Sequence, residues 1–235
     1  MRIYLVRHGE TIWNTEGRIQ GWKNSNLTEK GIEDAKALGK YLRDVDFQCA
    51  FTSPFQRAID TTKFILGDKN IVITSNDNFR ELNFGTWEGR VFQDVKAEYP
   101  EQHYNLWNKP EAYIPVDGEY LEQFRERVRQ GINDVIDSKY DGNILLVTHA
   151  LVVKSIYSIA RNLPVDKIWD TPRIGNTSLT ILEVDKVART ISILQEASTK
   201  HLEAEPVLWL WMMNLGNDEL WMMNYELRNK LLKGV

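Results

Sequence analysis

The sequence predicts an α/β fold, a three-layer α/β/α sandwich in which helices cover both faces of a mostly parallel central sheet. Two observations predict this class. Apolar strand patterns alternate with amphipathic helical patterns over the first 75 residues, which is typical of parallel strands joined by crossover helices. A further strand and helix follow at 143–161, after an irregular stretch. We therefore expect one sheet with a helical insert and an extra C-terminal tail.

The first part of the chain contains three expected strands and two expected helices. Each strand is a short run of apolar or β-branched residues, and the first helix repeats apolar residues at helical spacing. Thr28 is the expected N-cap of the first helix, and Ser53-Pro54 is expected to begin the second. The expected elements are strands at 2–6, 49–52 and 71–74, a helix at 29–43, and a helix that carries Arg57, Ala58, Thr61 and Ile65.

Residues 75–118 are rich in aromatic residues, Gly and Pro, and they predict a loop with short helices that forms an insert over the sheet's edge. The helix that follows has one apolar face, which contains Tyr120, Phe124 and Val128. Two alternating segments near residue 185 predict a terminal hairpin. The elements expected after the insert are a helix at 119–138, a buried strand at 143–147, a helix at 151–161, and hairpin strands at 177–184 and 190–194.

The composition bounds the function of the chain. With 43% hydrophobic and 26% charged residues, the 235-residue chain is typical of a globular protein. A formal net charge of −4 provides no general attraction to nucleic acid or to an anionic membrane. Cys49, the single cysteine, cannot form an internal disulfide, and it is expected to be a buried strand residue. No signal peptide or membrane-spanning run is visible, so we expect a cytoplasmic protein.

The composition changes near residue 203, where Met, Trp and Leu become frequent. We expect 1–202 to form one domain and 203–235 to be a hydrophobic C-terminal extension of unknown role. Three hypotheses fit this extension: it packs on its own domain, it mediates homo-oligomerisation, or it is not native to the protein. We favour packing on a protein surface, within or between chains. Asp218 is expected to cap a helix in the extension, with an apolar face of Leu220, Met223, Leu227 and Leu231.

The segment that follows the first strand has a composition suited to phosphate chemistry. His8 comes at the end of the strand, beside Arg7, and the chain then turns at Gly9. The guanidinium of Arg7 is a planar fork of donors that matches phosphate oxygens. A neutral imidazole of His8 can act as a nucleophile at pH 7. Asn14 could add a neutral donor to the same anion.

Three residues elsewhere, Arg57, Glu81 and His149, could join this group. Arg57 lies in the first turn of an expected helix, where free N–H groups favour anions. His149 follows a buried strand, and in an open parallel sheet ligands bind beyond the carboxyl ends of the strands. Taken singly, Arg57 is better explained as a surface arginine and His149 as a core histidine, and Glu81 is one acidic residue among many, explained as a solvated loop carboxylate.

The segments that carry these residues resemble the motifs of the histidine phosphatase superfamily, which includes the cofactor-dependent phosphoglycerate mutases. Arg7-His8-Gly9-Glu10-Thr11-x-x-Asn14 resembles its first signature, and 52–61, with Thr-Ser-Pro before Arg57-Ala58, resembles its second. The segment at 80–89, which contains Glu81, resembles the phosphatase-type motif, and 175–179 resembles a late motif. The resemblance covers about residues 1–200 and does not include the tail.

The resemblance implies a mechanism and a set of roles. His8 would form a phosphohistidine, while Arg7, Arg57 and His149 would bind the phosphoryl oxygens. Glu81 would protonate the leaving group, with Glu88 a weaker candidate for that task. No metal and no cofactor are expected, and the expected partner is a small-molecule phosphate ester. The residues expected to contact the substrate are Asn14, Gln20, Gly21 and Asn176.

Two readings of the reaction and one of another class remain open. The first is a phosphatase, and the second is a 2,3-bisphosphoglycerate-dependent phosphoglycerate mutase, which returns the phosphoryl group to the product. Mutases of the family carry a Glu-x-x-Tyr-Gly-type segment and then a basic stretch, whereas this chain has Phe84-Gly85-Thr86-Trp87 and few basic residues at 90–118. That difference favours hydrolysis. The third reading is a phosphate-ester binding protein without catalysis, which the full set of expected catalytic side chains disfavours.

Overall fold

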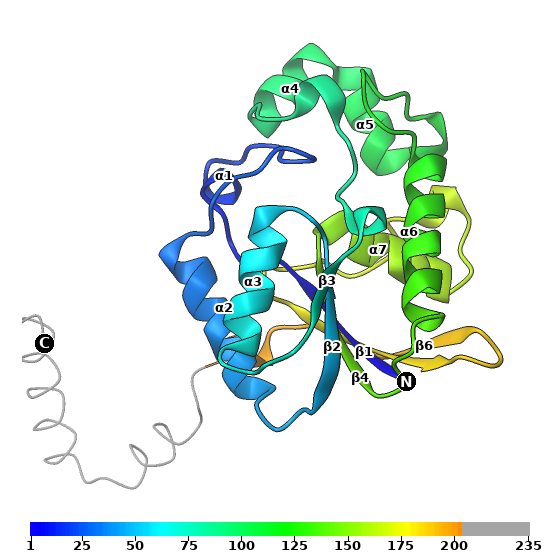
Figure 1. The fold of residues 1–235 in the computed structure, drawn as a ribbon. Helices are drawn as coiled ribbons and strands as arrows, with labels where there is room; N and C mark the ends of the chain where they lie inside the picture. Colours follow the sequence, from blue (N-terminus) through cyan, green and yellow to red (C-terminus); the bar gives the residue numbers. More distant parts are fainter. Residues whose placement is uncertain (204–235) are drawn as a thin grey trace, which may run out of the picture. The chain divides into compact units, whose positions relative to one another are not determined.

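The computed structural model describes residues 1–203, and these contain a six-stranded sheet with helices on both faces (Figure 1). The strands are β1 (Arg2–Arg7), β2 (Phe47–Thr52), β3 (Ile73–Ser75), β4 (Asn143–Thr148), β5 (Leu179–Asp185) and β6 (Thr190–Ser198). The α-helices are α1 (Ile12–Thr15), α2 (Glu29–Tyr41), α3 (Gln56–Leu66), α4 (Phe92–Glu98), α5 (Pro100–Asn108), α6 (Leu121–Ile136) and α7 (Ala150–Ala160).

The strands lie in the order β3-β2-β4-β1-β5-β6. β4 lies between β1 and β2 and pairs in parallel with both, while β3 extends the parallel part beside β2. β5 runs antiparallel to β1, and β6 runs antiparallel to β5. The predicted α/β sandwich with a mostly parallel sheet is confirmed. The predicted hairpin also forms, although its second strand continues to Ser198.

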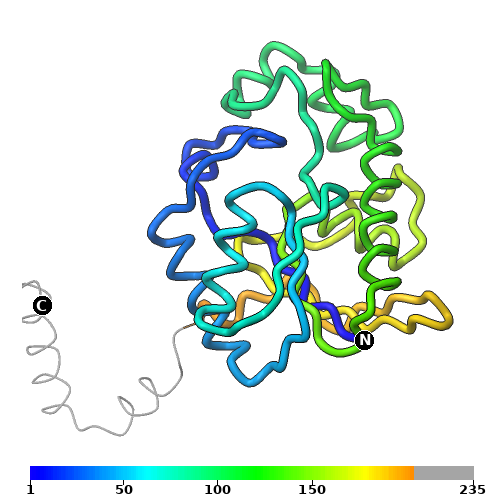
Figure 2. The backbone as a smooth tube through the Cα atoms, in the orientation of Figure 1, coloured from blue at the N-terminus to red at the C-terminus, as the bar shows by residue number. Residues whose placement is uncertain are grey.

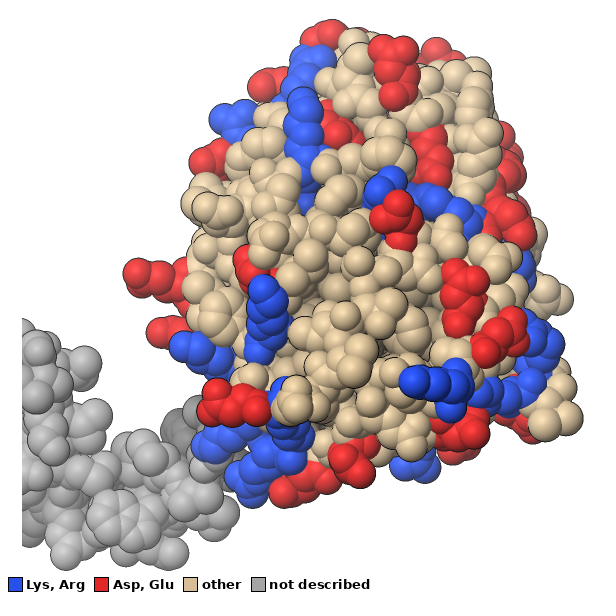
Figure 3. Space-filling view, in the orientation of Figure 1, with Lys and Arg blue, Asp and Glu red and all other residues tan. Residues whose placement is uncertain are grey.

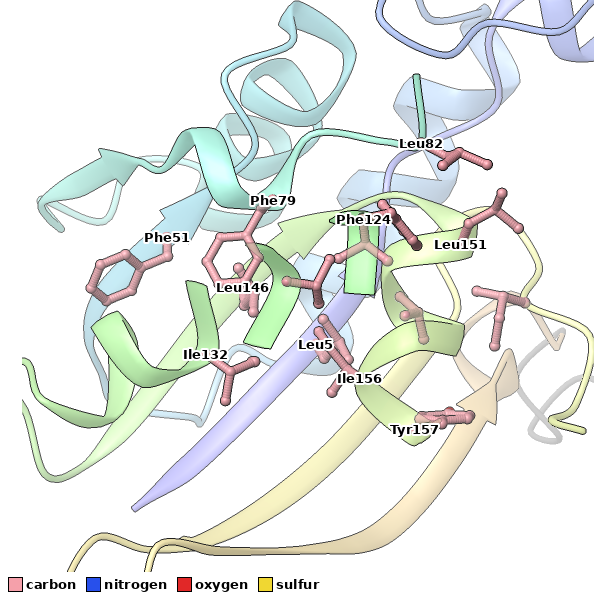
Figure 4. Packing of buried hydrophobic residues seen from close by; sticks show 14 of the residues in the cluster. Leu5, Phe51, Phe79, Leu82, Phe124, Ile132, Leu146, Leu151, Ile156 and Tyr157 are labelled. Atoms are coloured by element: carbon pink, nitrogen blue, oxygen red, sulfur yellow. The ribbon is translucent and has the colours of Figure 1, made fainter. Parts of the chain in front are cut away.

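The side chains of the central strands alternate between the two faces of the sheet. Leu5 and Leu146 belong to the cluster on the side of α6 and α7, whereas Val6 and Leu145 belong to the cluster on the side of α2 and α3. Figure 4 shows the first of these clusters, in which aromatic and aliphatic side chains from the helices surround Leu5. Because both faces are covered, β1 and β4 are apolar at all four of their central positions.

The two helix starts that the sequence predicted have different outcomes. Thr28 does cap α2, because its side chain accepts a hydrogen bond from the backbone N–H of Gly31 at 3.0 Å. The prediction for Ser53 is wrong: α3 begins at Gln56, with Phe55 in the N-cap position and no side-chain cap. Ser53 is fully buried, and its hydroxyl shares a hydrogen bond with His149 instead.

Residues 75–118 form the expected insert, and the edge of the sheet that they cover is the one at the carboxyl ends of the strands (Figures 1 and 2). Their aromatic side chains extend the core, since Trp87 and Tyr113 are buried in the same cluster as Leu5. Tyr120 was expected on the buried face of the next helix, but it precedes α6 and is 46% exposed.

Acidic and basic side chains are interspersed on the face of the protein that Figure 3 presents. Among the described residues, no helix is both long enough and apolar enough to cross a bilayer. The expectations for the C-terminal extension, which include the helix capped by Asp218 and homo-oligomerisation, concern residues 204–235. These lie outside the described residues, so those expectations stay predictions.

Close packing between α2 and the loop after β1 generates the first testable prediction. A Cβ atom added at Gly31 would lie 2.2 Å from the backbone oxygen of Glu10. Gly31→Ala should therefore lower the free energy of unfolding by about 1–3 kcal/mol, measured by urea denaturation. Gly175→Ala is the control, because its Cβ would meet only Thr199 Cγ2 at 3.7 Å. Equal stability of the two variants would contradict this packing.

Candidate active site

The backbone of two neighbouring strands brings the two predicted histidines together. β1 and β4 are parallel neighbours whose register pairs Arg7 with Thr148, so the residues that follow them emerge at the same edge. The backbone N–H of His8 donates to the carbonyl of Thr148 at 2.8 Å. The ring centroids of His8 and His149 lie 5.3 Å apart. Both rings therefore stand where an open parallel sheet binds its ligands.

The hydrogen bonding of His8 fixes its neutral tautomer. Nδ1 lies 2.8 Å from the carbonyl oxygen of Gly9, which can only accept, so Nδ1 carries the proton. In the neutral ring the free electron pair is then on Nε2. Burial, with the positive charges of Arg57 and Arg7, lowers the pKa of His8 well below its ordinary value of 6.5. His8 is consequently neutral and nucleophilic at pH 7.

Two arginines, buried Arg57 and half-buried Arg7, lie beside His8 in the same pocket. Arg7 donates from Nη1 to the carbonyl of Ile174 at 2.9 Å. Arg57 donates to the carbonyls of Lys23 and Gly21 at 2.7 and 2.8 Å, which ties the loop after α1 to α3. Burial lowers the pKa of each arginine to about 10, so both stay charged at neutral pH.

Several polar atoms of this group are buried but have no hydrogen-bond partner among residues 1–203. They are Arg7 Nε, Arg57 Nε, Gln20 Oε1 and His149 Nδ1. Unpaired buried donors are costly, and each unsatisfied group in a folded protein calls for an explanation such as a ligand or an ion. The two Nε–H groups can bind only an acceptor, because a guanidinium has no acceptor atom. The arrangement therefore suits an anion with several oxygen atoms.

His149 is completely buried, and its Nε2 lies 2.7 Å from the hydroxyl oxygen of Ser53. Burial lowers the pKa of His149 well below 6.5, and the charge of Arg57 acts in the same direction. The ring of Phe55 lies 5.6 Å from that of His149 and completes its enclosure. His149 is not among the residues that line the pocket, whereas His8 is.

Glu81 combines a pocket position with a pKa that is shifted upward. Its carboxyl oxygens accept hydrogen bonds from the backbone N–H groups of Leu82 at 3.0 Å and Leu151 at 3.3 Å. Burial raises the pKa of Glu81 above its ordinary value of 4.5, and these hydrogen bonds together with Arg57 and Arg7 oppose the increase. A carboxyl with a raised pKa can hold a proton at a pH where an exposed glutamate has lost it.

The four residues predicted to contact the substrate divide into two pairs. Gln20 and Gly21 lie in the loop that Arg57 holds, and both line the pocket. Asn14 also lines the pocket, but its Oδ1 accepts hydrogen bonds from Thr11 and from Asn176 Nδ2 at 3.2 Å. Asn176 Nδ2 also donates to the carbonyl of His8, so these contacts hold the chain on both sides of the histidine.

Glu88, the weaker candidate for the acid, has a structural role. Its Oε1 accepts hydrogen bonds from the backbone N–H groups of Trp22 at 2.8 Å and Phe84 at 3.1 Å. The Glu88 side chain packs so closely on Gly21 that an added Cβ there would lie 2.2 Å from Oε1. Glu88 thus fixes the loop that carries Gln20 and is not one of the pocket-lining residues.

The pocket has a volume of about 350 Å³, and one part of its wall is apolar. The insert provides much of this wall, and Trp87 and Trp107 are among the residues that line it. The charged and polar wall contains Arg7, His8, Asn14, Arg18, Gln20, Arg57 and Glu81, and the apolar wall contains Ile19, Phe84, Trp87, Phe92, Leu106 and Trp107.

The family model of the histidine phosphatase superfamily, branch 1, matches residues 3–196 of this chain. The chain belongs to that superfamily. The predicted membership is thereby confirmed, and with it the expectation of an enzyme of the phosphohydrolase type.

Individual relatives agree in fold and differ in the reaction that their names give. The adenosylcobalamin/alpha-ribazole phosphatase of Escherichia coli is 30% identical over 83% of this chain and 95% of its own length. A protein of Erwinia tasmaniensis with the name "Probable phosphoglycerate mutase GpmB" is 30% identical over 70% of this chain and 76% of its own length. The solved structure of Bacillus stearothermophilus YhfR is 35% identical, with a TM-score of 0.82 over 86% of this chain and 99% of that one.

Sequence patterns did not identify some residues that the fold places at the site. Ser53 contacts His149, and Arg127 on α6 donates to the backbone carbonyl of Glu81 at 2.9 Å. Ser53 directly precedes Pro54, and this favoured the helix-cap prediction over a buried role. Arg127 sits in a charged run on an amphipathic helix, where nothing local separates it from a solvent-exposed arginine. Cys49, as predicted, is a buried strand residue.

The buried histidines predict how stability depends on pH. The unfolded state takes up protons at His8 and His149 as the pH falls through about 6.5, whereas the folded state does not, so the free energy of unfolding decreases. His8→Asn should make this decrease shallower in thermal unfolding between about pH 8 and pH 5. Glu81→Gln should have the opposite effect, because the raised pKa of Glu81 contributes stability that is lost as the pH rises. An unchanged slope in His8→Asn would show that His8 takes up its proton over the same pH range in the folded and unfolded states, which would contradict the lowered pKa.

Proposed function

We propose that the protein is a metal-independent phosphomonoester hydrolase that acts on small phosphorylated metabolites through a phosphohistidine intermediate at His8. The observation that carries the proposal is the neutral His8 beside two arginines whose buried Nε–H groups have no acceptor among the described residues. A phosphate group supplies the oxygens that these donors lack, and it brings its phosphorus to the nucleophile.

In the first half of the proposed reaction, the electron pair of His8 Nε2 forms a bond to phosphorus. The bond between phosphorus and the ester oxygen breaks, and its electron pair leaves with that oxygen, which takes a proton from the Glu81 carboxyl. Arg7 and Arg57 bind the phosphoryl oxygens during transfer, when preorganised positive charge in a dry site is most effective. Neutral His149 joins them as a hydrogen-bonding group, because its ring lies 5.3 Å from that of His8 and its buried Nδ1 has no partner among residues 1–203, although His149 does not itself line the pocket. The alcohol then departs through the pocket.

In the second half, water attacks the phosphorus of the phosphohistidine. The Glu81 carboxylate, which gave up its proton in the first half, now accepts one from this water. The bond between phosphorus and Nε2 breaks, and its electron pair returns to His8, which is again neutral. Inorganic phosphate is released, and both His8 and Glu81 are in their initial protonation states. The same group therefore serves as acid and then as base, as microscopic reversibility permits.

Phosphoryl transfer back to the product, which would make the enzyme a mutase, is the second candidate, and the name of the Erwinia relative favours it. The apolar wall of the pocket favours hydrolysis. A bisphosphate cofactor needs a second set of cations, whereas the described pocket places its three arginines together with six apolar side chains. Arg18, the third arginine, already pairs with Glu16 at 2.5 Å and with the carbonyl of Gly89.

A phosphohistidine on His8 is the first expected result. Rapid acid-free quenching of the enzyme with ³²P-labelled substrate should trap label that is stable in base and labile in acid. His8→Ala should lose both the trapped label and at least about 10⁴-fold in kcat, because the nucleophile is absent. His103→Ala is the matched control, since His103 on α5 packs behind the wall residue Phe92, at 4.6 Å between ring centroids, and does not itself line the pocket. It should keep the trapped label and lose far less in kcat than His8→Ala. Appreciable turnover by folded His8→Ala would exclude the proposed nucleophile.

Parallel assays should decide between hydrolysis and transfer. Sugar phosphates, phosphoglycerates, nucleotides and aryl phosphates are screened with a chelator present, and mutase activity is measured with 2,3-bisphosphoglycerate. Hydrolysis of one or more monoesters should exceed mutase activity by at least about tenfold, in line with the apolar wall. Mutase activity above every hydrolytic rate would favour the second candidate. Tight binding of phosphate without any turnover would favour a binding protein.

A further inference from the structure

Arg127 on α6 makes an unusually complete set of hydrogen bonds just outside the pocket. Its side chain is only 17% exposed, and all five of its N–H donors have an acceptor. Three bonds reach backbone carbonyls of the segment that carries Glu81: Nη1 donates to Asn78 at 3.0 Å and to Arg80 at 2.7 Å, and Nη2 donates to Glu81 itself at 2.9 Å. The guanidinium thus joins α6 to the backbone of the proposed acid.

The other two donors of Arg127 orient the guanidinium. Nε and Nη2 donate to the two carboxyl oxygens of Glu119 at 2.7 and 2.8 Å, as a planar, bidentate pair. Glu119 is 13% exposed, and it is fixed in turn, because its backbone N–H donates to the carbonyl of Asn83 at 2.9 Å. The pair is therefore anchored on both sides of Glu81 in the sequence.

The segment needs these donors because it has no regular structure of its own. Residues 80–84 belong to no helix or strand, so their carbonyls lack the partners that secondary structure provides. The carbonyl of Glu81 receives one further hydrogen bond, from Trp22 Nε1 at 2.8 Å. Among residues 1–203, the side chain of Glu81 is held only by the N–H groups of Leu82 and Leu151, at 3.0 and 3.3 Å. The direction of the carboxyl thus depends on where Arg127 places the backbone.

We propose that Arg127, oriented by Glu119, is the positioning residue for the general acid. The inference rests on the proposed function, because it requires Glu81 to protonate the leaving group. Arg127 contacts neither the substrate nor the reacting atoms, and it is absent from the pocket wall. Its effect is on proton transfer, which is sensitive to small errors in position. Nucleophilic attack by His8 depends on other contacts and is left intact.

The test compares two aryl phosphate substrates of similar size, phenyl phosphate and p-nitrophenyl phosphate. Phenolate is the poorer leaving group and needs the proton more. The variants are Arg127→Lys, which keeps the charge but loses two donors, and Glu119→Gln, which keeps the shape but loses the ion pair. Arg129→Ala is the matched control, because this arginine of the same helix is 38% exposed and forms an ion pair with exposed Glu126 at 3.4 Å.

Arg127→Lys should lower kcat for phenyl phosphate about tenfold or more and kcat for p-nitrophenyl phosphate less than about threefold, with little change in KM. Glu119→Gln should show the same selectivity with a smaller loss, and it decides the matter if Arg127→Lys does not fold. In a Glu81→Gln background, Arg127→Lys should add less than about twofold, because the group that it positions is gone. Arg129→Ala should match the wild type.

Two results would overturn the inference. One is an equal loss on both substrates in folded Arg127→Lys and Glu119→Gln. The other is a double variant, Arg127→Lys with Glu81→Gln, whose fold-loss in kcat equals the product of the fold-losses of the two single variants. The proposed function fails separately: if Glu81→Gln itself slows both substrates equally, Glu81 is not the acid. If Glu81→Gln slows phenyl phosphate more than p-nitrophenyl phosphate while Arg127→Lys slows both equally, only the role of Arg127 is rejected.

Discussion

The parallel pairing of β1 with β4 is the constraint on which the site depends. It sets Arg7 opposite Thr148, and the hydrogen bond from His8 N to Thr148 O, at 2.8 Å, extends the pairing beyond the strands. His8 and His149 are consequently held by the two central strands of the sheet and not by loops alone. Both strands are covered on both faces by helices, which explains why the ring of each histidine is buried.

Burial then determines the charge state of the whole group. It lowers the pKa of His8 and His149, lowers that of the two arginines only to about 10, and raises that of Glu81. The site is therefore rich in positive charge at neutral pH, with neutral histidines and a carboxyl that tends to keep its proton. A phosphate monoester bound there would compensate the charge, and in the proposed reaction it would meet a neutral His8 and a Glu81 carboxyl of raised pKa.

Arginine side chains also support the irregular segments around the pocket. Arg57 binds the carbonyls of Gly21 and Lys23, and Arg127 binds three carbonyls between Asn78 and Glu81. In both places the planar guanidinium of a helix residue donates hydrogen bonds to loop carbonyls that have no partner within the loop. The loops that carry Gln20 and Glu81 are thus ordered from the helices behind them, and the site is set before a ligand binds.

The sequence by itself determined in which succession strands and helices follow one another along the chain, because apolar periodicity and caps such as Thr28 are local properties. It also placed His8 and His149 at strand ends, since each follows a buried apolar run. It misplaced Ser53 and Tyr120, and it did not single out Arg127. A Ser-Pro pair or an arginine in a charged helix looks the same locally whether it is exposed or buried. Only the tertiary structure decided these roles, because Ser53 meets His149, and Arg127 meets Glu81, across 96 and 46 residues of chain. Contacts at such separations exist only once the sheet and helices have packed.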